Sequence, residues 1–311
     1  MSDFPTPATF SGHETFTFRY PWLKKGVDGV RADSAIFQRD EAIVKLGVGK
    51  NMVTSIRHWC LATGMIQEKK PDKERRRMLE RSELGTRLLS DNGWDAYLER
   101  EATLWLLHWQ LVTNPNRATT WHGAFHLFNE PEFTRKSLAN FLMRLAEEKN
   151  WGRVSPGTVE SDVACFIRTY VPVKRGVTST QEDTLDCPLT ELALLQMIPG
   201  DKDEDHRYRF QTRPKRGLSP AIFAYALASF WEQHYPNQGT LSLREILHGA
   251  GSPGRAFRLD EQSVLNYLDA LSEATGGALG FEDTALIRQA VRVRTVHPLE
   301  ILERFYVKAA V

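Results

Sequence analysis

The sequence lacks the features by which several classes of protein are recognised. None of its apolar runs approaches the roughly 18 residues that a membrane-spanning helix requires. Its first residues do not show the basic and then apolar order of a secretory signal. The three cysteines lie far apart and form no CxxC pair, so neither a disulfide framework nor a zinc site is expected. These absences predict a cytoplasmic protein without membrane contact.

The signatures of common enzyme classes are also absent. There is no phosphate-binding glycine-rich loop with a lysine, no Gly-x-Ser-x-Gly and no His-Glu-x-x-His. His122 and His126 lie four residues apart, but no acidic residue or cysteine accompanies them at a spacing suited to a metal. We therefore expect no enzyme, no cofactor and no bound metal. A DNA-processing activity stays open, because nuclease sites are sparse in sequence.

Charge of one sign is not in excess. The chain of 311 residues has 40 Lys and Arg against 39 Asp and Glu, a formal net charge of +1. A nucleic-acid surface would therefore have to come from local clustering. With 41% hydrophobic residues, the chain can bury a core and form two or three domains.

Three stretches share one layout: a short helix, a tight turn, a second amphipathic helix and strand-like segments. In the first, a helix over 41–46 with Asp40 as its N-cap ends at Gly47, and a second helix covers 52–61. Segments 65–69 and 77–81 are predicted to form the two strands of a wing. We predict a mainly α fold with small β-wings, built from tandem winged helix-turn-helix-like modules.

The predicted boundaries follow this layout. Residues 1–96 hold an N-terminal arm and the first module, 97–200 a second helical module, and 201–311 a linker and the third module. The charged segment 199–205 is the predicted linker. Further helices are predicted over 97–112, 134–149, 221–231, 241–247 and 260–274, with one starting at Ser155-Pro156 and a hairpin over 278–293.

The helix over 52–61 separates its apolar and polar side chains. Val53, Ile56 and Trp59 share one face. The opposite arc, roughly 120° wide, holds side chains that typically contact phosphates and base edges: Lys50, Asn51, Thr54, Arg57 and His58. Leu61 lies in the same arc and does not fit this interpretation.

The matching helices of the other two modules are predicted to expose acidic residues. These are Glu160 and Asp162 in the second, and Glu261 and Asp269 in the third. Such faces repel phosphate. We therefore assign DNA contact to the first module and structural or protein-binding roles to the others.

A basic run lies between the two predicted wing strands. From Lys69 to Arg81 there are seven basic and three acidic residues. On a wing tip, Arg75, Arg76 and Arg77 would lie along the phosphate backbone. The alternative is a solvated charged loop.

The segment 10–26 concentrates aromatic and cationic residues. One interpretation is a surface that grips a nucleotide or a modified phosphate through His13, Arg19 and Lys24. The other is an arm that fills the core of the first domain, and alternation with polar residues favours a half-buried strand. The aromatic residues concerned are Phe16, Phe18, Tyr20 and Trp22.

Two motifs give a family resemblance. They are Ser11-Gly12-His13-Glu14-Thr15-Phe16 with Arg19-Tyr20-Pro21-Trp22-Leu23-Lys24-Lys25, and Leu46-Gly47-Val48-Gly49-Lys50-Asn51-Met52-Val53 with Ile56-Arg57-His58-Trp59. Together they resemble the bacterial domain-of-unknown-function family 4007. Members of this family lie in genome-defence islands, including neighbourhoods of DNA phosphorothioate modification and phage exclusion. The resemblance implies a DNA-directed role and protein partners from the same gene cluster, and it implies no catalytic residues.

The sequence therefore predicts a DNA-binding component of a bacterial defence or DNA-modification system, which contacts DNA through the first winged helix. The alternative is a protein-interaction scaffold or adaptor subunit with degenerate winged helices, which the near-neutral charge favours. An enzyme that acts on marked DNA is a third hypothesis. A homodimer would be the ordinary way for one helix-turn-helix to gain specificity.

Overall fold

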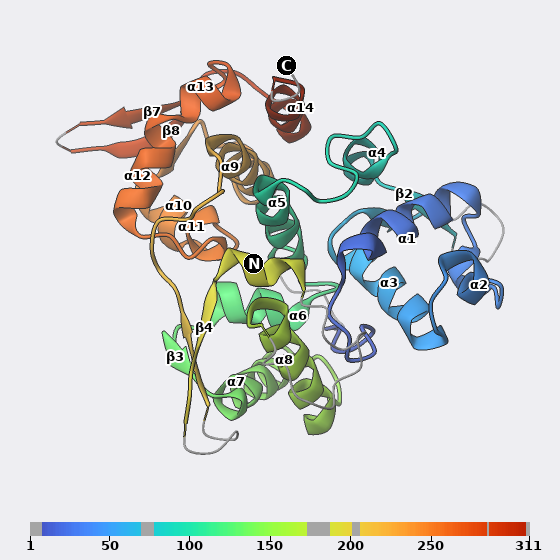
Figure 1. Cartoon of the computed structure of the whole chain (residues 1–311). Coiled ribbons are helices and arrows are strands. Elements are labelled where there is room, and N and C mark those ends of the chain that lie inside the picture. Colours follow the sequence, from blue (N-terminus) through green and yellow to red (C-terminus); the bar gives the residue numbers. More distant parts are fainter. Residues whose placement is uncertain (1–7, 70–77, 173–186, 201–205, 285, 309–311) are drawn as a thin grey trace. The chain divides into compact units, whose positions relative to one another are not determined.

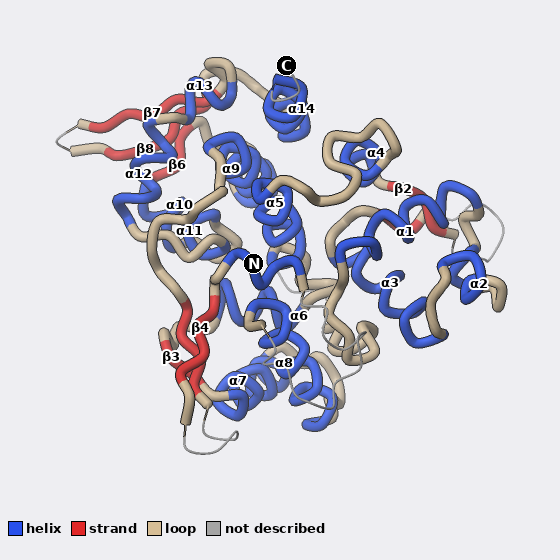
Figure 2. The backbone as a smooth tube through the Cα atoms, viewed as in Figure 1, coloured by secondary structure: helices blue, strands red, loops and turns tan. Residues whose placement is uncertain are grey.

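The computed structural model of this chain describes residues 8–69, 78–172, 187–200, 206–284 and 286–308. In these ranges the protein is mainly helical, with one two-stranded and two three-stranded antiparallel sheets (Figures 1 and 2). The predicted fold class is confirmed at this level. The chain divides into two compact units: Met1–Ala124 with Phe128–Phe210, and Phe125–Leu127 with Gln211–Val311.

The first unit begins with a helical cluster and a small sheet. Its elements are α1 (Tyr20–Ala32), a 3-10 turn η1 (Ile36–Gln38), α2 (Ala42–Leu46), α3 (Lys50–Ala62), β1 (Ile66–Glu68), β2 (Leu79–Arg81) and α4 (Glu83–Leu89). Strands β1 and β2 are antiparallel, with Gln67 opposite Glu80. The predicted order of helix, turn, helix and strand pair is therefore present.

Helix α1 stands where the sequence predicted a half-buried strand, and that prediction is wrong. Pro21 lies in its first turn, and the buried residues Trp22, Leu23, Val27 and Val30 follow a helical spacing. This face packs on α3. The interpretation of the arm as core is confirmed for Phe18 and Trp22, which are buried, whereas Tyr20 is 38% exposed.

The close contact between α1 and α3 requires a glycine. A Cβ at Gly26 would lie 2.3 Å from the sulfur of Cys60. Any larger residue would push the two helices apart, so Gly26 sets the distance at which α3 packs on α1.

The rest of the first unit consists of packed helices and a three-stranded sheet. The elements are α5 (Glu101–Val112), α6 (Thr119–His122), a π-turn η2 (Gly123–Leu127) that runs into the second unit, β3 (Glu132–Phe133), α7 (Arg135–Glu148), α8 (Pro156–Tyr170), a 3-10 turn η3 (Pro188–Leu192), β4 (Leu195–Ile198) and β5 (Arg207–Phe210). Thr134 and Ser137 form a capping box that starts α7. The sheet order is β3-β5-β4.

The hairpin of β4 and β5 corrects the predicted linker. Segment 199–205 separates two strands that pair with each other, with Met197 opposite Tyr208. It therefore joins the strands of a hairpin rather than two modules, and the division between the compact units falls after Phe210.

The second unit surrounds an apolar helix. Its elements are α9 (Pro220–His234), β6 (Thr240–Ser242), α10 (Leu243–His248), α11 (Pro253–Ala256), α12 (Glu261–Asp269), α13 (Leu271–Thr275), β7 (Leu279–Asp283), β8 (Arg288–Arg292) and α14 (Pro298–Lys308). Strand β8 lies between β6 and β7. Helix α9 packs against α13 and α14. The helices predicted over 221–231 and 241–247 and the hairpin over 278–293 are confirmed within a few residues, whereas the single helix predicted over 260–274 is divided at Ala270 into α12 and α13.

No helix in the described ranges has both the length and the apolar character that crossing a bilayer requires.

Candidate nucleic-acid interface

The turn between α2 and α3 presents the beginning of α3. Gly47 ends α2 with a left-handed backbone (φ 63°), a conformation that favours glycine. The Leu46 carbonyl accepts a hydrogen bond of 2.8 Å from Lys25 Nζ on α1. Gly49 precedes α3 in an extended conformation and offers no side chain to cap its first turn.

Three predicted contact residues lie exposed on the first turns of α3. They are Lys50, Asn51 and Thr54, and Lys45 at the end of α2 is exposed beside them in sequence. Val53, Ser55 and Ile56 point inward and are buried. Together the exposed side chains provide two ammonium groups, an amide and a hydroxyl, which are donors to phosphate and base-edge acceptors. We call these four residues the α3 surface.

Arg57 lies at the margin of the α3 surface and is half-buried. Its charge is one of those that lower the pKa of His58. It therefore sits closer to the interior than the predicted arc suggested.

The prediction that His58 contacts DNA is wrong. His58 is only 8% exposed, and its ring meets the edges of His13 and Trp59 at centroid distances of 5.6 and 5.2 Å. Burial, followed by the electrostatic effect of the neighbouring His13, lowers the pKa of His58 to about 3. The side chain is therefore neutral and internal at neutral pH. The helical arc was correct, but a second layer of chain covers His58; Leu61, on the same arc, is also buried.

That layer is the loop of residues 11–16, which we call the His13 loop. Four of its residues have a left-handed backbone: Ser11, Gly12, Glu14 and Thr15. A Cβ at Gly12 would lie 2.8 Å from Nδ1 of His58, so only glycine allows the loop to approach α3 this closely.

His13 fastens the loop to two helices. Its Nδ1 accepts a hydrogen bond from the Thr15 amide at 3.0 Å, so the proton lies on Nε2, which donates to Asp162 on α8 at 2.6 Å. The His13 carbonyl accepts from Ser55 of α3 at 2.9 Å. His13 is 1% exposed and Asp162 is 2% exposed. The expected ligand contact by His13 and the expected exposure of Asp162 are therefore both wrong.

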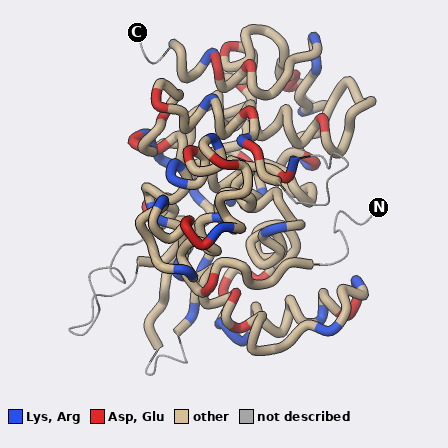
Figure 3. Tube along the Cα trace, turned by 90° about the vertical axis from the view of Figure 1, so that its right-hand side faces the viewer, with Lys and Arg blue, Asp and Glu red and all other residues tan. Residues whose placement is uncertain are grey.

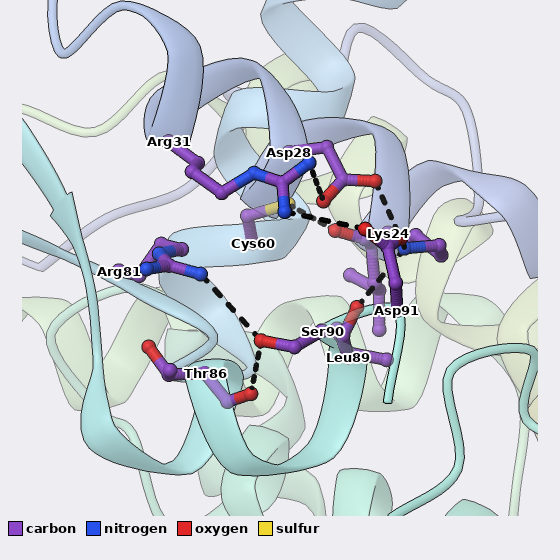
Figure 4. A network of polar contacts seen from close by, with 10 residues as sticks. Lys24, Asp28, Arg31, Cys60, Arg81, Thr86, Leu89, Ser90 and Asp91 are labelled. Carbon is purple, nitrogen blue, oxygen red and sulfur yellow. Dashed lines mark hydrogen bonds and ion pairs between the residues drawn. The ribbon is translucent and has the colours of Figure 1, made fainter. Parts of the chain in front are cut away.

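Lys24 belongs to a surface network of ion pairs (Figure 4). Its Nζ lies 2.9 Å from Asp28 and 2.8 Å from Asp91, and it donates to the Leu89 carbonyl at 3.2 Å. Burial alone would lower the pKa of Lys24, but the hydrogen bonds to Asp91 and Asp28 outweigh it and raise the pKa. Two carboxylates are thus already paired with the ammonium group that was predicted to contact a ligand. Lys24 therefore links α1 to the end of α4.

The structure describes Arg19, but the basic run between the two wing strands lies mostly outside the described residues. The Arg19 guanidinium lies 5.3 Å from the centroid of the Trp22 ring, a cation–π contact, and the side chain is half-buried. Arg75, Arg76 and Arg77 lie outside the described residues, so their contact with phosphates stays a prediction.

The described residues contain no group of three or more His, Cys, Asp or Glu side chains that could hold a metal ion. His122 is buried, and its Nδ1 lies 2.9 Å from the Val112 carbonyl. The α3 surface itself carries no carboxylate, so its chemistry is that of binding an anion.

Comparisons with known proteins give a family and two similar structures. A family model described as protein of unknown function DUF4007 matches residues 10–306. An SspB crystal structure matches with a TM-score of 0.87 and 29% identity, over 98% of this chain and 89% of that chain. A magnesium ion-bound SspB crystal structure matches with a TM-score of 0.86 and 30% identity, over 96% of this chain and 88% of that chain. No curated protein matches the sequence.

Proposed function

The chain belongs to the DUF4007 family, and from this premise we propose that it is a DNA-binding component of a bacterial defence or DNA-modification system. The phosphorothioation or phage-exclusion setting is the one that the family resemblance implies. The structural similarity to SspB extends over nearly the whole chain, so the proposal concerns the complete fold and not one shared module.

The α3 surface is the observation that carries this proposal. Helix α2, its glycine turn, α3 and the β1–β2 pair follow the order of a winged helix-turn-helix, in which the second helix enters the major groove. Helix α3 contains no Asp or Glu. Lys50 at its first turn suits a phosphate, and the Asn51 amide can pair with an adenine edge.

Charge elsewhere supports the assignment to α3. Lys and Arg alternate with Asp and Glu along much of the described chain (Figure 3). Glu160 on α8 and Glu261 on α12 are exposed, so these helices present carboxylates where α3 presents cations. A polyanion is therefore attracted to the α3 surface and repelled by Glu160 on α8, whereas Glu261 on α12 is already paired with Arg288 at 3.2 Å.

Magnesium does not enter the proposal. A magnesium ion is bound in one SspB structure. Mg²⁺ is usually held by one or two carboxylates, waters and substrate phosphates. The described residues of this chain do not gather a ligand group around a metal site, and we derive no metal-dependent step.

The direct test is DNA binding measured by fluorescence anisotropy on plain and phosphorothioate duplexes. Lys50→Ala/Asn51→Ala should weaken binding roughly tenfold or more, because each good base contact contributes about 1–3 kcal/mol. Lys136→Ala is the matched control, since Lys136 is exposed on α7 of the same unit. Equal affinities of the double variant and the wild type would refute the assignment, and a preference between duplexes would show what is recognised.

A protein-binding role is the second candidate, and the exposed apolar residues of α2 favour it. Val44 is 83% exposed and Ile43 is 41% exposed. Exposed apolar side chains next to a recognition helix also suit a partner protein. Val44→Ser should then abolish co-purification with a subunit from the same gene cluster while DNA affinity is unchanged. Loss of DNA affinity in this variant would instead place Val44 on the nucleic acid.

A further inference from the structure

A cavity of about 380 Å³ lies in the second unit, beside the end of β8. A cavity of this size falls in the range of small-molecule sites. Its lining combines cations, an aromatic ring and a carboxylate, all from one compact unit. The residues concerned are Trp231, Glu232 and Pro236 from α9 and the segment after it, and Arg292, Arg294 and His297 from the end of β8 and the segment that leads into α14.

The backbone that carries the two arginines is tied to the chain on both sides. The Arg292 amide donates to the Gly239 carbonyl at 2.8 Å, just before β6. The Arg294 amide donates to the Ala278 carbonyl at 3.1 Å, just before β7. Strands β6 and β7 are the two neighbours of β8 in the sheet. The sheet therefore fixes where both side chains begin, and both of them line the same cavity.

Backbone carbonyls hold the two guanidinium groups and do not neutralise them. Arg292 Nη1 donates to the Pro236 carbonyl at 3.0 Å, and Arg294 Nη2 donates to the Gly276 carbonyl at 3.2 Å. Among the described residues, no carboxylate lies within ion-pair distance of either side chain. Since a guanidinium has several N–H donors, each arginine keeps most of them for an anion in the cavity.

Arg292 also forms a flat platform. Its guanidinium lies over the Trp231 ring, 4.9 Å from the ring centroid. Trp231 is fully buried and its Nε1 donates to the Gln238 carbonyl at 2.9 Å, so the ring is held in one orientation. One face of the planar guanidinium rests on this ring, which leaves the other face for a second flat group. Guanidinium planes stack on nucleobases in this way.

The cavity contains one hydrogen-bond acceptor of full charge. Glu232 lies in the last turn of α9 and is exposed. No cation among the described residues lies within ion-pair distance of its carboxylate. A carboxylate accepts hydrogen bonds from the exocyclic amino group of a base and repels a carbonyl oxygen at the same position. Glu232 therefore selects a ligand that brings an N–H donor as well as an anionic group.

We propose that this cavity binds a nucleotide whose base carries an exocyclic amino group, as cytosine and adenine do. The base stacks on the Arg292 guanidinium and its amino group donates to Glu232. The phosphate lies against Arg294 and His297, the exposed donors of the lining. A cavity of this size takes a single nucleotide. The ligand is therefore either a free nucleotide or an unpaired nucleotide of a single strand, and the binding chemistry is the same for both.

Isothermal titration calorimetry of the full-length protein with dCMP, dAMP and dUMP tests the proposal. Both dCMP and dAMP should bind. The affinity for dUMP, which has a carbonyl oxygen in place of the amino group of dCMP, should be about tenfold lower. Glu232→Ala should remove this preference, because it removes both the acceptor and the repulsion. Arg294→Gln should weaken dCMP and dUMP alike by about tenfold, because a charged contact with the phosphate is lost.

The matched control is Arg244→Gln, because Arg244 is an exposed arginine of α10 in the same unit and does not line the cavity. This variant should bind dCMP as the wild type does. Absence of dCMP and dAMP binding, equal affinities of Arg294→Gln and the wild type, or a preference for dCMP that survives in Glu232→Ala would each overturn the proposal.

Competition identifies the source of the nucleotide. Displacement of dCMP by a short oligodeoxycytidine shows that the cavity takes an unpaired nucleotide of a strand. Displacement by mononucleotides alone shows that its ligand is a free nucleotide. The mononucleotide titrations contain no duplex, so their outcome stands even if the α3 surface does not bind DNA.

Discussion

Replacement of His58 by glutamine should remove a pH dependence of stability that the wild-type protein has. The pKa of His58 is about 3 in the folded chain, because the ring is buried and lies beside His13. In the unfolded chain it returns to about 6.5. Above that pH both states are neutral at this residue. Below it, the unfolded chain takes up a proton that the folded chain does not, and unfolding becomes easier.

The size of the effect follows from the two pKa values. Each pH unit between about 6.5 and 3 costs about 1.4 kcal/mol. At about pH 4.5 the wild-type protein has therefore lost about 2.7 kcal/mol through His58 alone. A glutamine side chain does not titrate, so this part of the loss disappears in His58→Gln.

Urea unfolding of the two proteins, followed by tryptophan fluorescence across the acidic range, measures this difference. All tryptophans except Trp231 lie in the first unit, so the signal reports on the part of the chain that contains His58. The variant starts with a constant deficit from lost packing, and that deficit should shrink as the pH falls. Parallel pH profiles would refute the burial of His58 and return it to the exposed face that the sequence suggested.

Three further outcomes are expected from packing, burial and capping. Gly26→Ala should destabilise the first unit by about 1–3 kcal/mol, because the added Cβ would lie 2.3 Å from the Cys60 sulfur. Adding Cys60→Ala to this variant should restore most of the lost stability, measured by urea unfolding. A double variant that is no more stable than Gly26→Ala would contradict the contact. Burial raises the pKa of the Cys60 and Cys165 thiols, and Cys187 is also buried. Ellman's reagent should therefore react with no thiol in the folded protein and with all three after unfolding. Rapid reaction of any thiol in the folded protein would argue against this packing. Thr134→Ala removes a capping-box hydrogen bond of α7 and should cost about 1 kcal/mol in thermal or chemical unfolding, whereas Thr134→Ser should keep most of the stability.

The helices could be predicted well where their start signals are local. Ser-Pro pairs precede both α8 and α9, and Gly47 marks the end of α2. Such signals act through the first or last turn of the same helix, so neighbouring sequence is sufficient. The β7–β8 hairpin could likewise be predicted, because its apolar segments lie close together in the chain.

Helix α1 was missed because two patterns overlap in it. Aromatic residues alternate with polar ones up to Trp22, which indicates a strand, while the buried spacing from Trp22 through Val27 to Val30 indicates a helix. The second pattern includes Gly26, although glycine is a poor helix former. The reason for a glycine at this position is its close contact with α3, which the sequence does not reveal.

The candidate site could be predicted only in part, because a helical wheel shows the faces of a helix and not what covers them. Lys50, Asn51 and Thr54 are exposed as expected. His58 lies on the same arc but is covered by the His13 loop, which is held by Asp162 from a helix about 150 residues away in sequence.

The most direct test of the central claim is the salt dependence of duplex DNA binding for the wild type, Lys50→Ala and Lys136→Ala. Loss of one phosphate contact should reduce the slope of log affinity against log salt by about 0.9. The account predicts this reduction for Lys50→Ala and an unchanged slope for Lys136→Ala. Equal slopes for all three proteins would contradict the assignment of α3 to DNA.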